Sequence, residues 1–140
     1  MGGGLMAYRY SSRSLSRLNT CDPDLVLLFT EVLADSDCPS DITILEGHRG
    51  EARQDEMYRT GKSQLRWPRS KHNSTPSMAV DAAPYINGAV SWDWPDYWPL
   101  VGFVKAKWAE LAAAGRVNGR LVCGADWKSF PDGPHYQIDR

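Results

Sequence analysis

The stretch Ser70–Tyr85, SKHNSTPSMAVDAAPY, passes from a polar loop that contains a proline into an apolar run over residues 78–85. The run has the composition and length of a buried strand. His72 lies in the loop, and Asp81 lies nine residues later in the predicted strand. The two could form half of a metal site, but a solvated loop histidine and a locally paired aspartate would fit the same pattern.

The chain has 140 residues, of which 16 are basic and 17 are acidic. This length predicts a single domain, residues 1–140, and the glycine-rich beginning suggests that the first 12 residues or so are flexible. The balanced charge argues against nucleic acid or an anionic membrane as a partner, and we expect a monomer.

The three cysteines, Cys21, Cys38 and Cys123, are odd in number and widely spaced. They are therefore expected to be free, small, buried side chains in a reducing compartment. No apolar run is long enough to cross a membrane, and the beginning of the chain lacks the pattern of a secretory signal. We expect a protein that is made in the cytoplasm without a signal peptide.

Two shorter segments have helical patterns. Apolar residues spaced by three and four positions predict a helix over residues 23–35. Residues 51–61 predict a short polar helix, which Gly61 can end in a left-handed conformation.

The segment 91–115 predicts a longer helix that begins after Asp93 or Asp96 and ends at Gly115. We expect Pro99 to lie in its first turn, where the missing N–H is not needed.

Aromatic residues gather at the start of this helix. Tyr97 falls on its apolar stripe, and we expect Trp92, Trp94 and Trp98 to pack against the sheet edge rather than bind a ligand.

Strands are predicted over residues 41–47 and 78–85, and two short ones over residues 120–126 and 134–139. Together with the helices they predict an α+β fold, in which a small, mostly antiparallel sheet carries the helices on one side.

The residues alone leave a metal site open. His48 adjoins an arginine, which disfavours a cation beside it, whereas His72 and His135 each have an aspartate nearby in sequence. Asp132, three residues before His135, lies in a Pro-Asp-Gly-Pro sequence that by itself predicts a tight turn.

SKHNSTPSMAVD and FPDGPHYQI together resemble motifs of the LAS-type zinc peptidases of the M15 family. The family motif S-x-H-x-x-G-x-A-x-D matches at Ser70, His72, Ala79 and Asp81, although Pro76-Ser77 replaces its glycine and the loop is two residues longer. The D-x-x-H motif matches at Asp132 and His135. A glycine, an arginine two residues later and a glutamine five residues beyond that match at Gly47, Arg49 and Gln54.

The resemblance implies a hedgehog/D-Ala-D-Ala peptidase-like fold and a role for each matched residue. His72, Asp81 and His135 would ligate Zn²⁺, and Asp132 would be the general base. Three further roles follow from the motifs: substrate binding through a carboxylate or the developing oxyanion for Arg49, substrate binding for Gln54, and a hydrogen bond that orients His72 for Ser70.

The activity implied is that of a phage endolysin that hydrolyses the L-Ala–D-Glu bond of bacterial peptidoglycan. Such an enzyme stays in the cytoplasm of the producing cell until a holin-type protein opens the membrane. Two alternatives remain: a D-Ala-D-Ala carboxypeptidase with the same zinc site, and a non-catalytic wall-binding module of the same fold.

Overall fold

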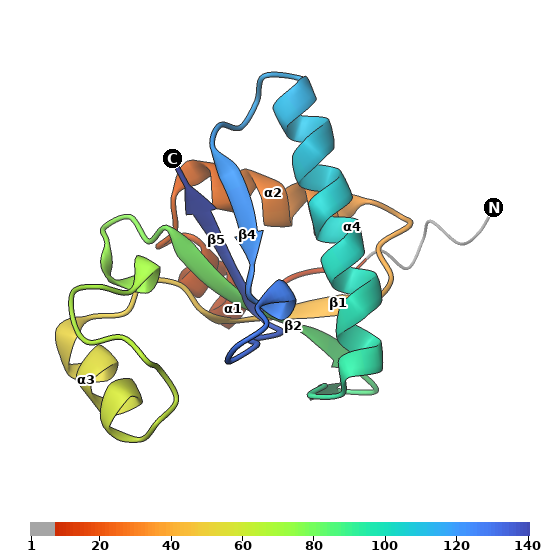
Figure 1. The fold of residues 1–140 in the computed structure, drawn as a ribbon. Coiled ribbons are helices and arrows are strands. Elements are labelled where there is room, and N and C mark those ends of the chain that lie inside the picture. Colours follow the sequence, from red (N-terminus) through yellow and green to blue (C-terminus); the bar gives the residue numbers. More distant parts are fainter. Residues whose placement is uncertain (1–7) are drawn as a thin grey trace.

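The computed structural model describes residues 8–140 of the chain, and within them four α-helices accompany one five-stranded sheet (Figure 1). The strand order is β1-β2-β5-β4, the short β3 pairs with β2, and all of these pairs are antiparallel. The strands are β1 (Asp41–Glu46), β2 (Ala79–Ile86), β3 (Ala89–Val90), β4 (Arg120–Cys123) and β5 (His135–Asp139). The predicted α+β fold with a small antiparallel sheet is confirmed.

The helices are α1 (Ser12–Leu18), α2 (Pro23–Ala34), α3 (Glu51–Arg59) and α4 (Trp94–Ala113). Two short 3₁₀ turns, η2 (Lys71–Asn73) and η3 (Gly124–Asp126), lie in the connections. Helices α2 and α4 contact each other, and α4 also contacts β2 and β4. Helix α3 lies apart from this packed body, at the lower left of Figure 1, next to the long connection that leads to β2.

Helix α2 supplies much of the core, as its spacing predicts. Its buried residues are Leu25, Leu28, Phe29, Val32 and Leu33. Asp22 caps the helix by accepting a hydrogen bond from the Asp24 N–H at 2.9 Å, and Pro23 occupies the first turn. The Phe29 ring meets the Tyr136 ring of β5 edge-on, with centroids 5.2 Å apart. This contact joins the helix layer to the central strands.

Helix α4 begins after Asp93, one of the two N-cap residues that the sequence predicted. Asp93 occupies the N-cap position, and Pro95 stands in the first turn, where a proline ring fits without cost. Pro99 therefore lies inside the helix, one turn further on, and the prediction that it belongs to the first turn is wrong. Asp96 is not the cap, because its carboxylate accepts a hydrogen bond from Ser91 Oγ at 2.6 Å.

The expected packing of the aromatic residues holds for only one of the four. Tyr97 is 2% exposed and faces the core, but Trp92, Trp94 and Trp98 are 66%, 39% and 50% exposed. Trp94 and Trp98 stand one helical turn apart and share an exposed face of α4, whereas the Tyr97 side chain is buried. The tryptophans do not seal the sheet.

Helix α1 was not predicted, because its sequence SRSLSRL lacks an apolar stripe. Leu18 anchors the helix in the core, Ser11 caps it, and the buried Ser14 Oγ accepts a hydrogen bond from the Ile44 N–H of β1 at 3.0 Å. The prediction of a flexible beginning concerns residues 1–12, of which residues 1–7 lie outside the described part. Tyr10 packs against the core and donates to the Phe29 carbonyl at 2.7 Å.

Two further expectations concern the body of the fold. Cys21, Cys38 and Cys123 are buried and free, as predicted. The strand expected over residues 120–126 ends at Cys123, because the chain turns into η3 at Gly124. Among residues 8–140, no helix combines the length and the apolar content required to cross a membrane.

Replacing Phe29 by alanine should lower the free energy of unfolding by about 3–5 kcal/mol, because the cavity left under Tyr136 cannot close. Urea denaturation followed by circular dichroism measures this loss. Leu15→Ala on α1 is the control, since Leu15 is 44% exposed, and its loss should stay within about 0.5 kcal/mol. Equal losses in the two variants would contradict the proposed core.

Candidate metal centre

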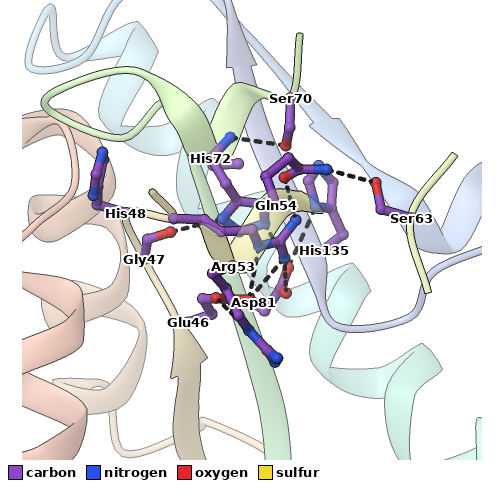
Figure 2. A network of polar contacts seen from close by, with 12 residues as sticks. Glu46, Gly47, His48, Arg53, Gln54, Ser63, Ser70, His72, Asp81 and His135 are labelled. Atoms are coloured by element: carbon purple, nitrogen blue, oxygen red, sulfur yellow. Dashed lines mark hydrogen bonds and ion pairs between the residues drawn. The ribbon is translucent and has the colours of Figure 1, made fainter. Parts of the chain in front are cut away.

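The sheet register brings three polar side chains into one row. Asp81 of β2 lies opposite Glu46 of β1 on one side and opposite His135 of β5 on the other. Residues directly opposite each other in neighbouring strands project to the same face. Glu46, Asp81 and His135 therefore emerge together on the face that Figure 2 shows.

A bulge in β1 sets the first of these pairings. Ile44 lies opposite Ala82, but Glu46 rather than Leu45 lies opposite Asp81. The extra residue changes which side chain of β1 reaches this face. Without it, the apolar Leu45 would stand beside Asp81.

His72 approaches the same point from the loop before β2. It sits in η2, which is tied to the end of β1 by a hydrogen bond from the Arg49 N–H to the His72 carbonyl at 2.8 Å. The His72 Nε2 atom lies 3.1 Å from Asp81 Oδ1, and His135 Nδ1 lies 3.3 Å from the same oxygen. The three side chains offer ligand atoms within 4.8 Å of one another. His72, Asp81 and His135 could thus hold one metal ion.

The outer contacts of both imidazoles select the tautomers that metal binding requires. His72 Nδ1 lies 2.7 Å from the Gly47 carbonyl, so it carries the proton and leaves the Nε2 lone pair facing Asp81. His135 Nε2 lies 2.7 Å from Gln137 Oε1, so this nitrogen donates and Nδ1 is free to ligate. A hydrogen bond on the far nitrogen is the usual support of a ligating histidine. Two neutral imidazoles and one carboxylate fit a divalent transition metal.

The electrostatics of the cluster favour an ionised carboxylate at its centre. Burial alone raises the pKa of Asp81, but the charges and hydrogen bonds of His72 and His135 outweigh burial and hold that pKa well below its usual range. Burial lowers the pKa of His135, yet the hydrogen bond and charge of Asp81 raise it above its ordinary value. Asp81 is therefore ready to ligate a cation.

Asp132 lines the same cavity as His72, Asp81 and His135. Its turn is anchored by hydrogen bonds from the Asp132 N–H to the Gly124 carbonyl at 2.9 Å and from the His135 N–H to the Asp132 carbonyl at 3.2 Å. A Cβ at Gly124 would come within 2.5 Å of that Asp132 carbonyl oxygen, so only glycine permits the approach. Burial and the charge of Asp81 raise the pKa of the Asp132 carboxyl.

Arg49 is more deeply placed than the motif implies. Its guanidinium is 5% exposed and donates to Glu46 Oε1 from Nε at 3.1 Å and from Nη2 at 2.7 Å. Nη2 also lies 3.8 Å from Asp81 Oδ2. The positive charge therefore lies beside Asp81 and borders the cavity with little exposed surface.

Gln54 has no exposed surface, which revises the expected contact with substrate. Its Oε1 accepts from Arg49 Nη1 at 3.0 Å and from Asn73 Nδ2 at 3.1 Å, and its Nε2 donates to Ser63 Oγ and to the Leu65 carbonyl. These partners use its whole hydrogen-bonding capacity. Gln54 holds Arg49 and the following loop in place and does not reach the cavity.

Ser70 contacts the backbone of His72 rather than its ring. Its hydroxyl accepts from the backbone N–H of His72 at 3.2 Å, so it caps η2, and the Gly47 carbonyl is what orients the ring. Asn73 completes the capping box by accepting from the Ser70 N–H at 3.0 Å. The spacing of Ser70 and Asn73 resembles a capping box closely enough that Asn73 could have been noticed in the sequence.

The third histidine stays outside the centre. Figure 2 shows the His48 ring turned away from His72 and His135. Its neighbour Gly47 must be a glycine, because a Cβ there would lie 2.3 Å from the Arg17 carbonyl. Two other contacts of the centre were missed. Gln137 could have been found from its place two residues after His135 on one strand face, whereas Trp127, whose ring lies 5.1 Å from that of His135, follows no local pattern.

The centre opens into a cavity of about 590 Å³. His72, His135, Asp81 and Asp132 line it, together with the apolar side chains of Met57 and Leu65. Three aromatic side chains also border it, namely Trp92, Trp127 and Phe130. A cavity of this size, mostly apolar with a few convergent polar groups, suits a short peptide segment.

The sequence and the fold both match known peptidases. A model of the phage L-alanyl-D-glutamate peptidase family matches residues 6–139. The L-alanyl-D-glutamate peptidase of Escherichia phage T5 is 33% identical over 135 residues, which covers 96% of this chain and 92% of that protein. The peptidoglycan L-alanyl-D-glutamate endopeptidase CwlK of Bacillus subtilis (strain 168) is 31% identical over 106 residues, 70% of this chain and 60% of that protein.

Among solved structures, that of the L-Ala D-Glu endopeptidase ChiX of Serratia marcescens superposes with a TM-score of 0.77. The two chains are 32% identical, and the match covers 96% of this chain and 92% of that one. The likeness extends over sequence and fold and nearly the full length of the chain. The chain belongs to the phage L-alanyl-D-glutamate peptidase family.

Proposed function

We propose that this protein is a zinc-dependent peptidase that hydrolyses the L-Ala–D-Glu bond in the stem peptide of bacterial peptidoglycan. The observation that carries the proposal is the convergence of His72 Nε2, Asp81 Oδ1 and His135 Nδ1 at one wall of the cavity, with both histidine tautomers selected for ligation. Family membership supports the substrate, since the related proteins are named for this bond.

Zinc suits the three residues, because three protein ligands of nitrogen and oxygen type leave a fourth position open, as in catalytic zinc sites. When bound, Zn²⁺ would acidify a water and polarise the peptide carbonyl. The protein contributes a fixed ligand geometry, since Gly47 and Gln137 hold the far sides of the two imidazoles.

Asp132 is the proposed general base. Its carboxylate has a raised pKa, lines the same cavity, and makes no hydrogen bond or ion pair with another side chain within residues 8–140. A base of this kind takes a proton from the attacking water and then gives it to the amine of D-glutamate as the peptide bond breaks. The tight turn around Asp132 keeps the carboxylate close to the ligands without adding it to them.

Arg49 places a positive charge beside Asp81. Glu46 and Gln54 engage three of its five N–H groups, and the residue borders the cavity. We assign it the stabilisation of negative charge that develops on the substrate carbonyl. Gln54 and Ser70 serve as positioning residues for Arg49 and for the His72 turn.

We propose that the protein is stored in the cytoplasm of the producing cell and reaches the wall after a holin-type protein opens the membrane. We also propose that it acts as a monomer.

Mass spectrometry of fragments released from purified peptidoglycan tests the function. The expected products are peptides that begin at D-glutamate, lost after chelation and regained with zinc. Release of free D-alanine would instead indicate a carboxypeptidase. Sedimentation of the protein with walls without any released fragment would indicate a binding module.

Asp132→Ala should retain stoichiometric zinc and lose about 10²- to 10⁴-fold in kcat, because proton transfer is removed while the ligands remain. His135→Ala should lose both zinc and activity. Metal analysis of purified variants and initial rates on soluble muropeptides measure both effects. Near wild-type turnover by Asp132→Ala, or full zinc occupancy in His135→Ala, would refute the corresponding assignment.

Gln137→Ala should weaken zinc binding about 10- to 100-fold, because the His135 imidazole loses the acceptor that fixes its tautomer. Competition with a fluorescent chelator gives the affinity. Gln64→Ala is the matched control, since Gln64 borders the cavity but is not a hydrogen-bond partner of either histidine ring within residues 8–140. The same affinity in both variants would remove Gln137 from the support of the centre.

In metal-free protein, Asp132→Asn should raise the melting temperature at pH 7. The raised pKa means that the folded state resists ionisation of this carboxyl, so its charge costs stability above the ordinary pKa of 3.8. The gain should vanish as the pH falls below that value, because the carboxyl is then protonated in both states. Scans with chelator at several pH values measure it, and Asp37→Asn, at an exposed position, is the control. A lower melting temperature at pH 7 would contradict the assigned electrostatics.

A further inference from the structure

Trp92, Trp94 and Trp98, here called the tryptophan patch, form an exposed aromatic surface at the start of α4. Half of the six tryptophans of the chain lie within these seven positions, and all three are more than one-third exposed. Large exposed aromatic side chains grouped in this way mark contact sites more often than chance. The patch lies at the lower end of α4 in Figure 1, where β3 leads into the helix.

The patch offers flat rings. The Trp94 and Trp98 rings stack with their centroids 5.3 Å apart and an angle of 24° between their planes. The Trp94 ring also leans on Tyr97, with centroids 6.0 Å apart, and Tyr97 is buried. The Trp98 ring thus stacks on a Trp94 ring that itself contacts the buried Tyr97, and the two exposed rings present a flat surface.

The patch is continuous with the cavity of the metal centre. Trp92 lines that cavity together with His72 and His135, and Trp94 follows it by two residues. The aromatic surface therefore starts at the rim of the cavity and extends over the first turns of α4. A substrate that leaves the cavity along Trp92 would reach the stacked pair next.

The substrate of the proposed function must leave the cavity close to the cut bond, and the inference rests on that function. In peptidoglycan the amine of L-alanine is acylated by the lactyl group of N-acetylmuramic acid. Only one residue, which spans about 3.6 Å at most, separates the sugar attachment from the L-Ala–D-Glu bond. The sugar must then lie at the rim.

We propose that the tryptophan patch binds the N-acetylated sugars of the glycan strand to which the stem peptide is attached. The apolar C–H faces of a sugar ring pack on the negative face of an indole. Asp93, between two of the tryptophans, is exposed and makes no capping hydrogen bond, so its carboxylate can accept from sugar hydroxyls. The same negative charge disfavours an anionic lipid surface as the occupant.

The test compares two substrates that differ only in the glycan: a disaccharide-linked stem peptide and the same peptide with an acetylated L-alanine. The wild-type protein should have a higher kcat/KM on the first. In Trp94→Ala/Trp98→Ala this preference should fall about tenfold, equivalent to 1.4 kcal/mol. Trp98→Phe should keep most of it because a flat ring remains. Tyr8→Ala, an exposed aromatic outside the patch, should keep all of it.

Binding is measured separately with N-acetylglucosamine oligomers, through quenching of tryptophan fluorescence, and thermal scans show whether each variant is folded. Failure to cut either substrate would refute the proposed function. Cleavage of both with an unchanged preference in the double variant would overturn the glycan site alone. Oligomer binding that survives the double substitution would do the same. Two other outcomes would also overturn the glycan site if glycan binding is absent. Sedimentation with phosphatidylglycerol vesicles that is lost in the double variant would assign the patch to a membrane. Dimerisation that is lost in the double variant would assign it to a second copy of the chain.

Discussion

The pairing of Asp81 with two neighbouring strands is the constraint on which the centre depends. Because β2 lies between β1 and β5, one residue of it faces Glu46 and His135 at once. The bulge in β1 and the tight Asp132 turn before β5 adjust the flanking strands to this register. The backbone hydrogen bonds of the antiparallel sheet thus fix Asp81 and His135 relative to each other. Of the three proposed ligands, only His72 lies in a loop.

Contacts around these residues set the tautomers of the two histidines and the position of Arg49. The Gly47 carbonyl and Gln137 determine which imidazole nitrogens face Asp81, and Glu46 and Gln54 hold Arg49 beneath it. Most of these contact residues are buried, so their hydrogen bonds meet little competition from water. Asp132 differs, because its carboxylate has no side-chain partner among residues 8–140. Its raised pKa means that the charged form lowers the stability of the fold, which suits a group that carries a proton.

The sequence pointed to His72, Asp81, Asp132 and His135 through two motifs that resemble those of the LAS-type peptidases, and all four side chains border one cavity in the structure. Their roles as ligands and base stay predictions. The helices and strands with clear periodicity were also predictable. The residues that surround the site were not predictable from the sequence. Glu46 reaches Asp81 only through a bulge, the burial of Gln54 depends on how residues 63–65 fold over it, and the exposure of the tryptophans depends on which face α4 turns to the sheet. Such features arise from tertiary packing, on which local patterns carry no information.

The central claim is that one zinc ion is held by Nε2 of His72 and Nδ1 of His135 together with Asp81. Two-bond ¹H–¹⁵N correlation spectra of zinc-loaded protein with ¹⁵N-labelled histidine distinguish the two ring nitrogens directly. The account predicts that His72 retains a proton on Nδ1, that His135 retains one on Nε2, and that only the opposite nitrogens shift on zinc binding. Zinc on the other nitrogen of either ring, or no shift at one of the two histidines, would contradict it.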